Sequence, residues 1–408
     1  MRVLFVSFAW QSHYFQMASL AWAFRAAGHE VRVAAQPSAH RAITASGMVG
    51  VEVGQEHDIL ADMADTNRVV RERIGGLLHA KAADEVDPQH TRWVQETVFA
   101  PHLRSAAAMT GDLFEFARWW RPGLIVTDPM VYAAPLVAEA LGIPHVRHMY
   151  GPDVTRFLRF PGHFEAPEDD VTGAWPAELL HLYEKFGVRP RAGYARYTLD
   201  PTPDGLQFPG VFRRLPERFV PYNGPGILPD WLVAPQLRPR TLVTWGNITT
   251  ATNGVEGFLI PTVLRALRDM DIEVVVAVKK SDRALLGDVP DNARIVEEVP
   301  IHVLLPTCAA TINQSGASTV MTAAACGVPQ LVLPRVGDQT FVSDRLGACG
   351  AGVCLPAGQV DTESIAAGLT EILADGSETA AAAARLRREV ESAPSLPQTV
   401  AAMEELVA

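Results

Sequence analysis

The chain has 408 residues, of which 48% are hydrophobic and 20% charged, and its formal net charge is −11 at pH 7. This length and composition suit a globular protein with two or three domains, of which we expect two. The negative balance, without a basic cluster to follow a phosphate backbone, argues against a nucleic-acid-binding protein. The N-terminus resembles a buried strand rather than a signal peptide, and no apolar run reaches transmembrane length. Four cysteines without metal-like spacing fit a cytoplasmic protein.

The first βαβ unit places a histidine at the start of a helix. Val3–Phe8 is almost wholly apolar, as expected of a central parallel strand, Tyr14–Ala27 has a helical pattern, and Glu30–Ala35 predicts the next strand. His13 stands where the helix begins, and the positive helix end disfavours imidazolium, so a neutral imidazole able to accept a proton is expected near pH 7. Position alone leaves two alternatives, a catalytic base or a histidine that only caps or packs.

A long excursion without strand character follows. After a short strand expected within Ser46–Val53, residues 55–100 carry mixed charges and scattered apolar positions, including Trp93. Such excursions in α/β enzymes are usually functional loops or lids. We expect helical pieces that cover an acceptor cleft; a solvated insertion without substrate contact is the alternative.

A carboxylate ends the next buried strand. Leu124–Thr127 predicts that strand, Asp128 follows it, and a helix over Tyr132–Leu141 and a strand over His145–Met149 come next. Open α/β sheets bind ligands at the carboxyl ends of their strands, so Asp128 is placed to orient His13 by a hydrogen bond. A simple helix N-cap is the alternative for Asp128.

Residues 150–232 change in character, with frequent proline and interleaved aromatic residues such as Tyr150 and Phe157. The first half predicts an apolar acceptor pocket, and residues 207–231 predict an interdomain linker. A second α/β domain is expected from residue 232, with its first strand over Thr241–Trp245. A small polar loop, residues 246–250, follows that strand.

A complete strand–loop–helix–strand unit covers residues 309–333. Residues 313–316 break a short apolar strand, Ala317–Cys326 has helical composition, and Gly327 and Pro329 end that helix before the next strand, Leu331–Leu333. A loop of small residues that opens a helix is an anion site, because free N–H groups and the helix dipole meet there. The sequence therefore predicts a phosphate or diphosphate site, with an ordinary βα turn as the alternative.

This unit and its neighbours resemble the donor-binding signature of bacterial antibiotic glycosyltransferases of the GT-B fold, family 1 type. The branch that attaches TDP-deoxysugars to polyketides is the most similar. The matching residues are VPIHVLLP at 299–306, Gly316, Gly327, Pro329 and the pair Asp338–Gln339. One departure stands in the loop, where the family usually has two histidines and this chain has Asn313 and Gln314. Gln314 replaces the histidine that contacts the diphosphate; it can donate a hydrogen bond but cannot become cationic.

The resemblance implies two doubly wound, Rossmann-like α/β domains that face each other across a cleft. Residues 1–206 would bind the acceptor, 207–231 would link the domains, 232–390 would bind the nucleotide sugar, and a C-terminal helix, 391–408, would pack back on the first domain. The implied reaction is a metal-independent, inverting transfer of a TDP-linked deoxysugar to a hydroxyl of an apolar aglycone such as a polyketide. No cofactor is implied beyond the sugar donor itself. His13 matches the general-base histidine of the family, and Asp128 its orienting aspartate.

The resemblance and the loops together give the expected site residues. Those expected at the donor diphosphate and nucleotide are Gly246, Asn247, Thr249, Val299, Gln314, Ser315, Gly316, Ala317, Ser318 and Thr319. Those expected at the donor sugar are Asp338 and Gln339, and those expected at the acceptor are Trp10, Phe15, Trp93, Met149, Tyr150 and Phe157.

Several questions stay open at this point. A homodimer and a cytochrome-like activator protein bound at residues 55–100 remain as partners besides the two small-molecule substrates; no nucleic acid, membrane or metal is expected. The competing functions are a C-glycosyltransferase on the same fold, a sugar-nucleotide epimerase, and a non-catalytic paralogue, the last suggested by Asn313 and Gln314.

Overall fold

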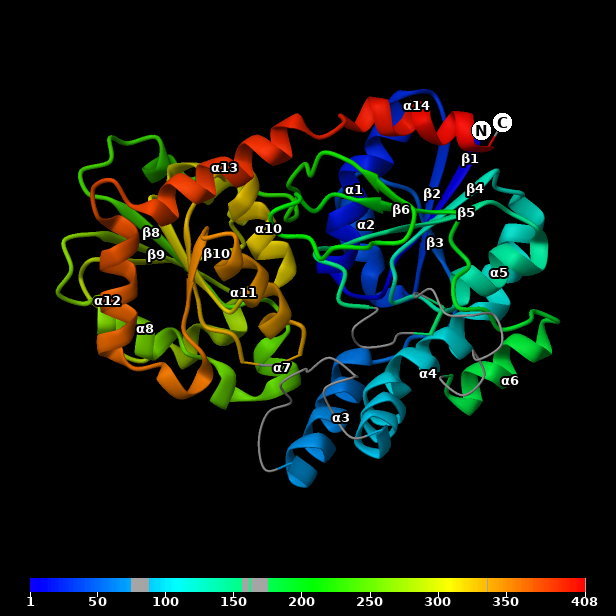
Figure 1. Cartoon of the computed structure of the whole chain (residues 1–408), viewed down its shortest axis with the longest axis horizontal. Coiled ribbons are helices and arrows are strands. Elements are labelled where there is room, and N and C mark those ends of the chain that lie inside the picture. The colour runs from blue at the N-terminus through cyan, green and yellow to red at the C-terminus, as the bar shows by residue number, and fades with distance from the viewer. Residues whose placement is uncertain (75–87, 156–160, 163–174, 336, 408) are drawn as a thin grey trace.

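The computed structural model of the chain describes all residues except 75–87, 156–160, 163–174, 336 and 408. Two parallel β-sheets lie beside each other, and helices cover both faces of each (Figure 1). This architecture confirms the prediction of two doubly wound α/β domains. Phe157 lies outside the described residues. No helix in the described part of the chain is long and apolar enough to cross a membrane.

The first sheet has seven parallel strands in the order β3-β2-β1-β4-β5-β6-β7. Two neighbouring central strands, residues 2–6 and 124–127, are mostly apolar, as expected where helices cover both faces. The strands are β1 (Arg2–Val6), β2 (Glu30–Ala35), β3 (Gly50–Glu52), β4 (Leu124–Thr127), β5 (His145–His148), β6 (Tyr197–Asp200) and β7 (Arg214–Pro216).

The second sheet has six parallel strands in the order β10-β9-β8-β11-β12-β13. The strands are β8 (Arg240–Thr244), β9 (Glu273–Val278), β10 (Ala293–Glu297), β11 (Ala310–Asn313), β12 (Gln330–Val332) and β13 (Gly352–Cys354). The first strand of each domain therefore lies inside its sheet, where the order of connection reverses. Open α/β sheets bind ligands at this switch point.

The helices of the first domain are α1 (Gln11–Ala26), α2 (His40–Ala45), α3 (Ile59–Ile74), α4 (Pro88–Trp120), α5 (Ala133–Leu141) and α6 (Ala177–Lys185). Those that follow are α7 (Thr249–Asn253), α8 (Ile260–Leu267), α9 (Ile301–Leu304), α10 (Ala317–Cys326), α11 (Gln339–Ala348), α12 (Thr362–Leu373), α13 (Glu378–Ser392) and α14 (Leu396–Val407). In the first domain α1, α2 and α14 share one core cluster, and α4, α5 and α6 share the other. In the second, α8 and α12 cover one face, while α10, α11 and α13 cover the opposite one.

The C-terminal helices connect the two domains. The chain crosses from α13 on the second domain to α14, which lies along α1 on the first, so the two termini end close together (Figure 1). Val400 and Met403 of α14 are buried in the core cluster of the first domain. A polar contact also joins α14 to the first domain, with His29 Nε2 and Glu404 Oε1 2.8 Å apart.

The proline-rich segment holds more regular structure than its composition suggested. Helix α6 and strands β6 and β7 lie in it, and β7 falls within residues 207–231, which we expected to be linker. Arg214–Pro216 pairs with β6 at the edge of the sheet, where a proline costs no ladder hydrogen bond. The stretch that passes from one sheet to the other therefore begins after Pro216.

Candidate functional site

His13 and Asp128 meet at the switch point of the first sheet. His13 lies in the first turn of α1, directly after β1, and Asp128 follows β4, the strand paired with β1. The distance from His13 Nδ1 to Asp128 Oδ2 is 2.5 Å, and the side chains are 12% and 1% exposed. The other carboxylate oxygen, Oδ1, accepts a 2.7 Å hydrogen bond from the N–H of Met130. Asp128 therefore both braces its turn and fixes the imidazole, which leaves His13 Nε2 as the nitrogen free for substrate.

Aromatic side chains surround this histidine. Ring centroids of Tyr150, Phe8 and Trp10 lie 4.8, 5.5 and 5.6 Å from that of His13. Burial, together with the nearby carboxylates of Asp338 and Asp128, raises the pKa of Tyr150 well above its usual value. Tyr150 is therefore a neutral phenol, able to donate a hydrogen bond.

A second histidine, His102 of α4, lies on the far side of Phe8, with ring centroids 5.0 Å apart. Its side chain is buried, and its Nδ1 has no hydrogen-bond partner within the described structure. Burial, reinforced by the nearby His13, lowers the pKa of His102 to about 4, so the imidazole is neutral at pH 7. Sequence reasoning missed it, because a histidine inside a long helix carries no signal of what the helix faces.

The remaining acceptor candidates do not all join this group. Phe15 packs on Tyr222, with ring centroids 5.2 Å apart, and on Gly224 in the segment between the domains. Met149 is fully buried, and Trp93, on α4, lies under the guanidinium of Arg73 at 4.2 Å. Trp10 and Tyr150 are thus the members of the set that the structure brings to His13.

The predicted anion loop lies at the switch point of the second sheet. It follows β11, and the loop of residues 246–248 follows the neighbouring strand β8. Asn313 is the last residue of β11 rather than part of the loop; its side chain donates to Gln330 Oε1 at 3.1 Å and accepts from Ser315 N at 2.8 Å. Ser315 has a φ of 67° and is fully buried. Non-glycine residues held in this sparsely populated region cluster at functional sites.

Gln314 connects the two loops. Its Oε1 accepts a 2.9 Å hydrogen bond from Thr249 Oγ1, which fixes the amide orientation. Its Nε2 lies against two glycines: a Cβ would be 2.3 Å from this nitrogen at Gly246 and 3.7 Å at Gly316. Only glycine at position 246 therefore leaves room for the amide, which presents its N–H groups between the loops. Asn247 is exposed in the loop of residues 246–248.

Helix α10 begins at this place without a side-chain cap among the described residues. Gly316 is its N-cap, and Ala317 is buried, whereas Ser318 and Thr319 are half-buried. Ser318 Oγ accepts a 2.6 Å hydrogen bond from Gln16 Nε2 of α1 in the first domain. The N-terminus of α10 thus lies near the helix that carries His13, a proximity that sequence reasoning did not predict.

The Asp338–Gln339 pair also comes close to His13. Asp338 is the N-cap of α11, and Gln339 Oε1 accepts a 2.9 Å hydrogen bond from Arg335 N. Burial raises the pKa of the Asp338 carboxyl, and the proximity of His13 offsets part of that rise. The acidic residue of the predicted sugar-binding pair therefore lies within electrostatic reach of the predicted base.

The segment before α9 packs against the interdomain connection. Val299 is half-buried against the core cluster that contains Leu304 and Leu305, and Pro300 would lie 2.2 Å from a Cβ at Gly226. His302 N donates to Asn223 Oδ1 at 3.1 Å. His302 thus acts here as a structural contact to the connection. Among the described residues, no group of three or more His, Cys, Asp or Glu side chains is arranged to hold a metal ion.

Comparison with known proteins gives consistent matches along the chain. The N-terminal domain of the family described as erythromycin biosynthesis protein CIII-like matches residues 22–246, and its C-terminal domain matches residues 261–406. The chain is 34% identical to 3-alpha-mycarosylerythronolide B desosaminyl transferase of Saccharopolyspora erythraea, over 100% of this chain and 99% of that protein. It is 36% identical to 10-deoxymethynolide desosaminyltransferase of Streptomyces venezuelae, over 100% and 97%.

The fold comparison agrees. The crystal structure of the glycosyltransferase VinC in complex with dTDP superimposes with a TM-score of 0.81 at 33% sequence identity. The match covers 100% of this chain and 99% of VinC.

Proposed function

The chain belongs to the erythromycin biosynthesis protein CIII-like family and is a polyketide antibiotic glycosyltransferase of the GT-B fold, and on this premise we propose its reaction. It transfers a deoxysugar from a TDP-linked donor to a hydroxyl of a polyketide aglycone, in a single displacement that inverts the anomeric carbon. The relatives named as desosaminyl transferases and the VinC complex with dTDP support this donor and acceptor class.

The observation that carries the proposal is the pairing of His13 with Asp128. The carboxylate holds the Nδ1 side of the ring at 2.5 Å, so that Nε2 can take the proton of an acceptor hydroxyl as its oxygen attacks the sugar. The carboxylate also stabilises the imidazolium that forms. A base of this kind contributes typically 10²–10⁴-fold, so roughly that loss is expected without it.

The leaving diphosphate has neutral hydrogen-bond donors available to it. The amide of Gln314, the first N–H groups of α10 and the hydroxyls of Ser318 and Thr319 gather at one place, and the dipole of α10 adds partial positive charge. Such preorganised donors can contribute several kcal/mol to a transition state in which negative charge develops on the leaving group.

The remaining assignments rest on the family resemblance and on the positions described above. Asp338 and Gln339 are proposed to bind hydroxyls of the donor sugar, and the backbone near Val299 to meet the nucleobase. Trp10, Tyr150 and His102 are proposed to line the acceptor side. The first domain would hold the aglycone and the second the nucleotide sugar, as expected from the sequence.

The experiment combines the purified chain with a panel of TDP-deoxysugars and macrolide or anthracycline aglycones. Mass spectrometry should find a product heavier than the aglycone by the sugar less one water, and NMR should show an anomeric configuration opposite to that of the donor. A product joined through carbon would replace this account with C-glycosylation. Donor turnover without acceptor, giving an isomeric nucleotide sugar, would indicate an epimerase instead.

A further inference from the structure

The loop that follows β5 touches both halves of the proposed site. Tyr150 packs on His13 and belongs to two clusters, one in the first domain with Trp10 and one in the second with Val320. Gly151, the next residue, lies directly against the first residue of α10. A Cβ at Gly151 would be 2.7 Å from the Cβ of Ala317. The loop is therefore in contact with the proposed base on one side and the proposed diphosphate helix on the other.

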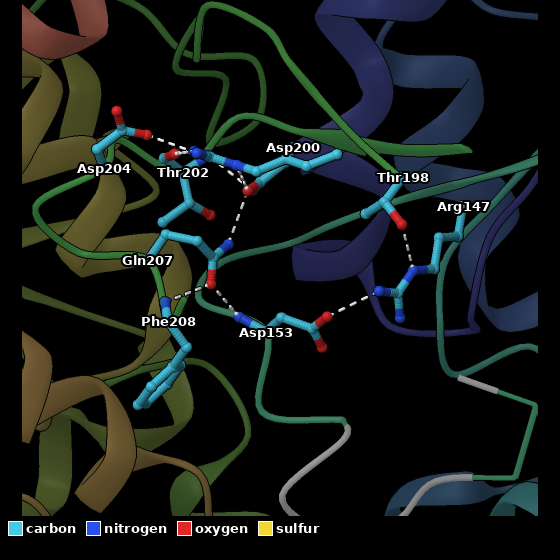
Figure 2. A network of polar contacts seen from close by, with 9 residues as sticks. Arg147, Asp153, Thr198, Asp200, Thr202, Asp204, Gln207 and Phe208 are labelled. Atoms are coloured by element: carbon cyan, nitrogen blue, oxygen red, sulfur yellow. Dashed lines mark hydrogen bonds and ion pairs between the residues drawn. The ribbon is translucent and has the colours of Figure 1, made fainter. Parts of the chain in front are cut away.

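A buried polar network fixes this loop (Figure 2). Arg147 of β5 donates to Asp153 Oδ2 and to Thr198 Oγ1, both at 2.7 Å, and the side chains of Arg147 and Asp153 are 3% and 0% exposed. Asp153 N donates at 2.8 Å to Oε1 of Gln207, whose Nε2 donates at 2.8 Å to Asp200 Oδ2. A buried ion pair adds little net stability, because desolvation offsets its attraction. Its effect here is to hold the loop in one conformation.

Hydrogen bonds to the second domain also hold part of this network. The turn that contains Gln207 also contains Gly205, whose N–H donates to Glu389 Oε2 of α13 at 2.9 Å. The carbonyl of Gly205 accepts from Arg345 Nη2 of α11 at 3.1 Å. The loop is thus held from both domains, and Gly151 contacts the second domain at Ala317.

We propose that Gly151 is a positioning residue for the transfer reaction: its missing Cβ lets the loop rest on Ala317, which sets the separation between His13 and the N-terminus of α10. This inference rests on the proposed function of both groups. Carbon atoms in contact lie about 3.5–4.0 Å apart, so a Cβ at position 151 must push the two domains apart by about 1 Å. A misplacement of that size can cost roughly a hundredfold in rate.

The test is the variant Gly151→Ala, alone and combined with Ala317→Gly, which removes the opposing Cβ. Gly151 lies outside the left-handed region, so alanine brings no backbone strain and the effect is steric. We expect G151A to lower kcat roughly tenfold to a hundredfold while the Kd for TDP changes less than about twofold. The double variant should approach the kcat of Ala317→Gly alone, which is its reference because Ala317 opens the proposed diphosphate helix. Gly111→Ala is the matched control, because a Cβ there meets nothing within 4 Å, and it should retain the kcat of the parent.

Two results would overturn the inference: a G151A variant as fast as the parent, or a double variant as slow as G151A. If G151A does not fold, the double variant carries the test, since only a clash at Ala317 would be relieved by Ala317→Gly. Failure of the proposed function would appear in the parent itself, as TDP binding without sugar transfer to any acceptor. Failure of the present inference would appear only in the variants of an active parent.

Discussion

The carboxylate of Asp128 is expected to control which proton His13 carries. Because Asp128 accepts at Nδ1, the free Nε2 is left without a proton and can act as a base. Asp128→Asn would offer an amide N–H to Nδ1 and favour the tautomer with the proton on Nε2. We expect kcat to fall roughly a hundredfold or more, with the Kd for TDP unchanged. Steady-state kinetics and calorimetry on the same preparation measure both. A variant with normal turnover would show that the carboxylate only braces its turn.

Gln314 tests the diphosphate loop. Replacing it with alanine removes an amide donor between Gly246 and Gly316, so TDP should bind more weakly by on the order of 1 kcal/mol, or somewhat more because the partner is charged. Replacing it with histidine should strengthen binding mainly below about pH 6.5, where imidazole gains charge. Calorimetry at pH 6 and pH 8 compares the three proteins. Equal TDP affinity of parent and Gln314→Ala at both pH values would place the diphosphate elsewhere.

His102 should make the fold sensitive to acid. Its pKa is lowered by burial to about 4, whereas the same imidazole in the unfolded chain binds a proton below about pH 6.5. The unfolded state therefore gains protons first, and stability falls as the pH drops from about 6.5 toward 4. At pH 5 the loss from this group is about 2 kcal/mol in the free energy of unfolding. Urea denaturation at pH 8 and pH 5 should show a smaller loss for His102→Gln than for the parent, and equal losses would contradict the assignment.

At the scale of elements, sequence reasoning predicted the bounds of a helix correctly where capping residues such as glycine stand at both of its ends. The helix expected over Ala317–Cys326 has those bounds in the structure, because Gly316 and Gly327 fix its two caps. The prediction that His13 and Asp128 are partners also depended on recognising elements. Each residue follows a strand with a clear apolar run, so both were expected at the same edge of the sheet.

Sequence reasoning failed where tertiary contacts decide. The edge strand β7 is only three residues long and ends in proline, so pairing with β6 rather than propensity creates it. The excursion after residue 55 gave no sign that α4 would run unbroken through Pro101. Contacts between domains, such as that of Gln16 with Ser318, left no pattern in the sequence. Each residue lies in the N-terminal part of a helix whose sequence is ordinary.

Helix α3 of the first domain forms hydrogen bonds to the end of α7, beside the proposed donor site. Asn67 Nδ2 donates to Thr252 O at 3.0 Å, and Arg71 Nη1 donates to Asn253 O at 2.9 Å, which holds the end of α7. Since α7 begins with Thr249, the residue that orients Gln314, the double variant Asn67→Ala/Arg71→Ala should weaken TDP binding roughly fivefold or more.

The matched control for the Asn67→Ala/Arg71→Ala variant is Arg68→Ala. Arg68 lies on the same helix, is exposed, and forms ion pairs with Asp65 and Glu72 of α3 itself. The TDP affinity of the Arg68→Ala variant, measured by calorimetry, should stay within about twofold of that of the parent. Equal affinity of the double variant and the control would mean that α3 covers the donor domain without supporting it.

At the scale of the molecule, two sheets of the same connection order bring their switch points together. His13 and Asp128 follow one pair of neighbouring strands, and Thr249 and Gln314 follow another, so topology fixes the positions of the proposed base and of the proposed anion site. Their approach depends on the contacts between domains, among them Gln16 with Ser318 and Gly151 with Ala317. Whether an activator protein or a second copy is needed is answered by the turnover of the purified chain at nanomolar concentration.

The most direct test of the account is acceptor-dependent release of TDP by the parent chain and by His13→Ala. The parent should release TDP rapidly only when both the TDP-sugar and a hydroxyl acceptor are present. His13→Ala should bind TDP with the affinity of the parent. Because it lacks the proposed base, its turnover should fall roughly a hundredfold or more. Near-normal acceptor-dependent release by His13→Ala would contradict the central claim that His13 removes the acceptor proton.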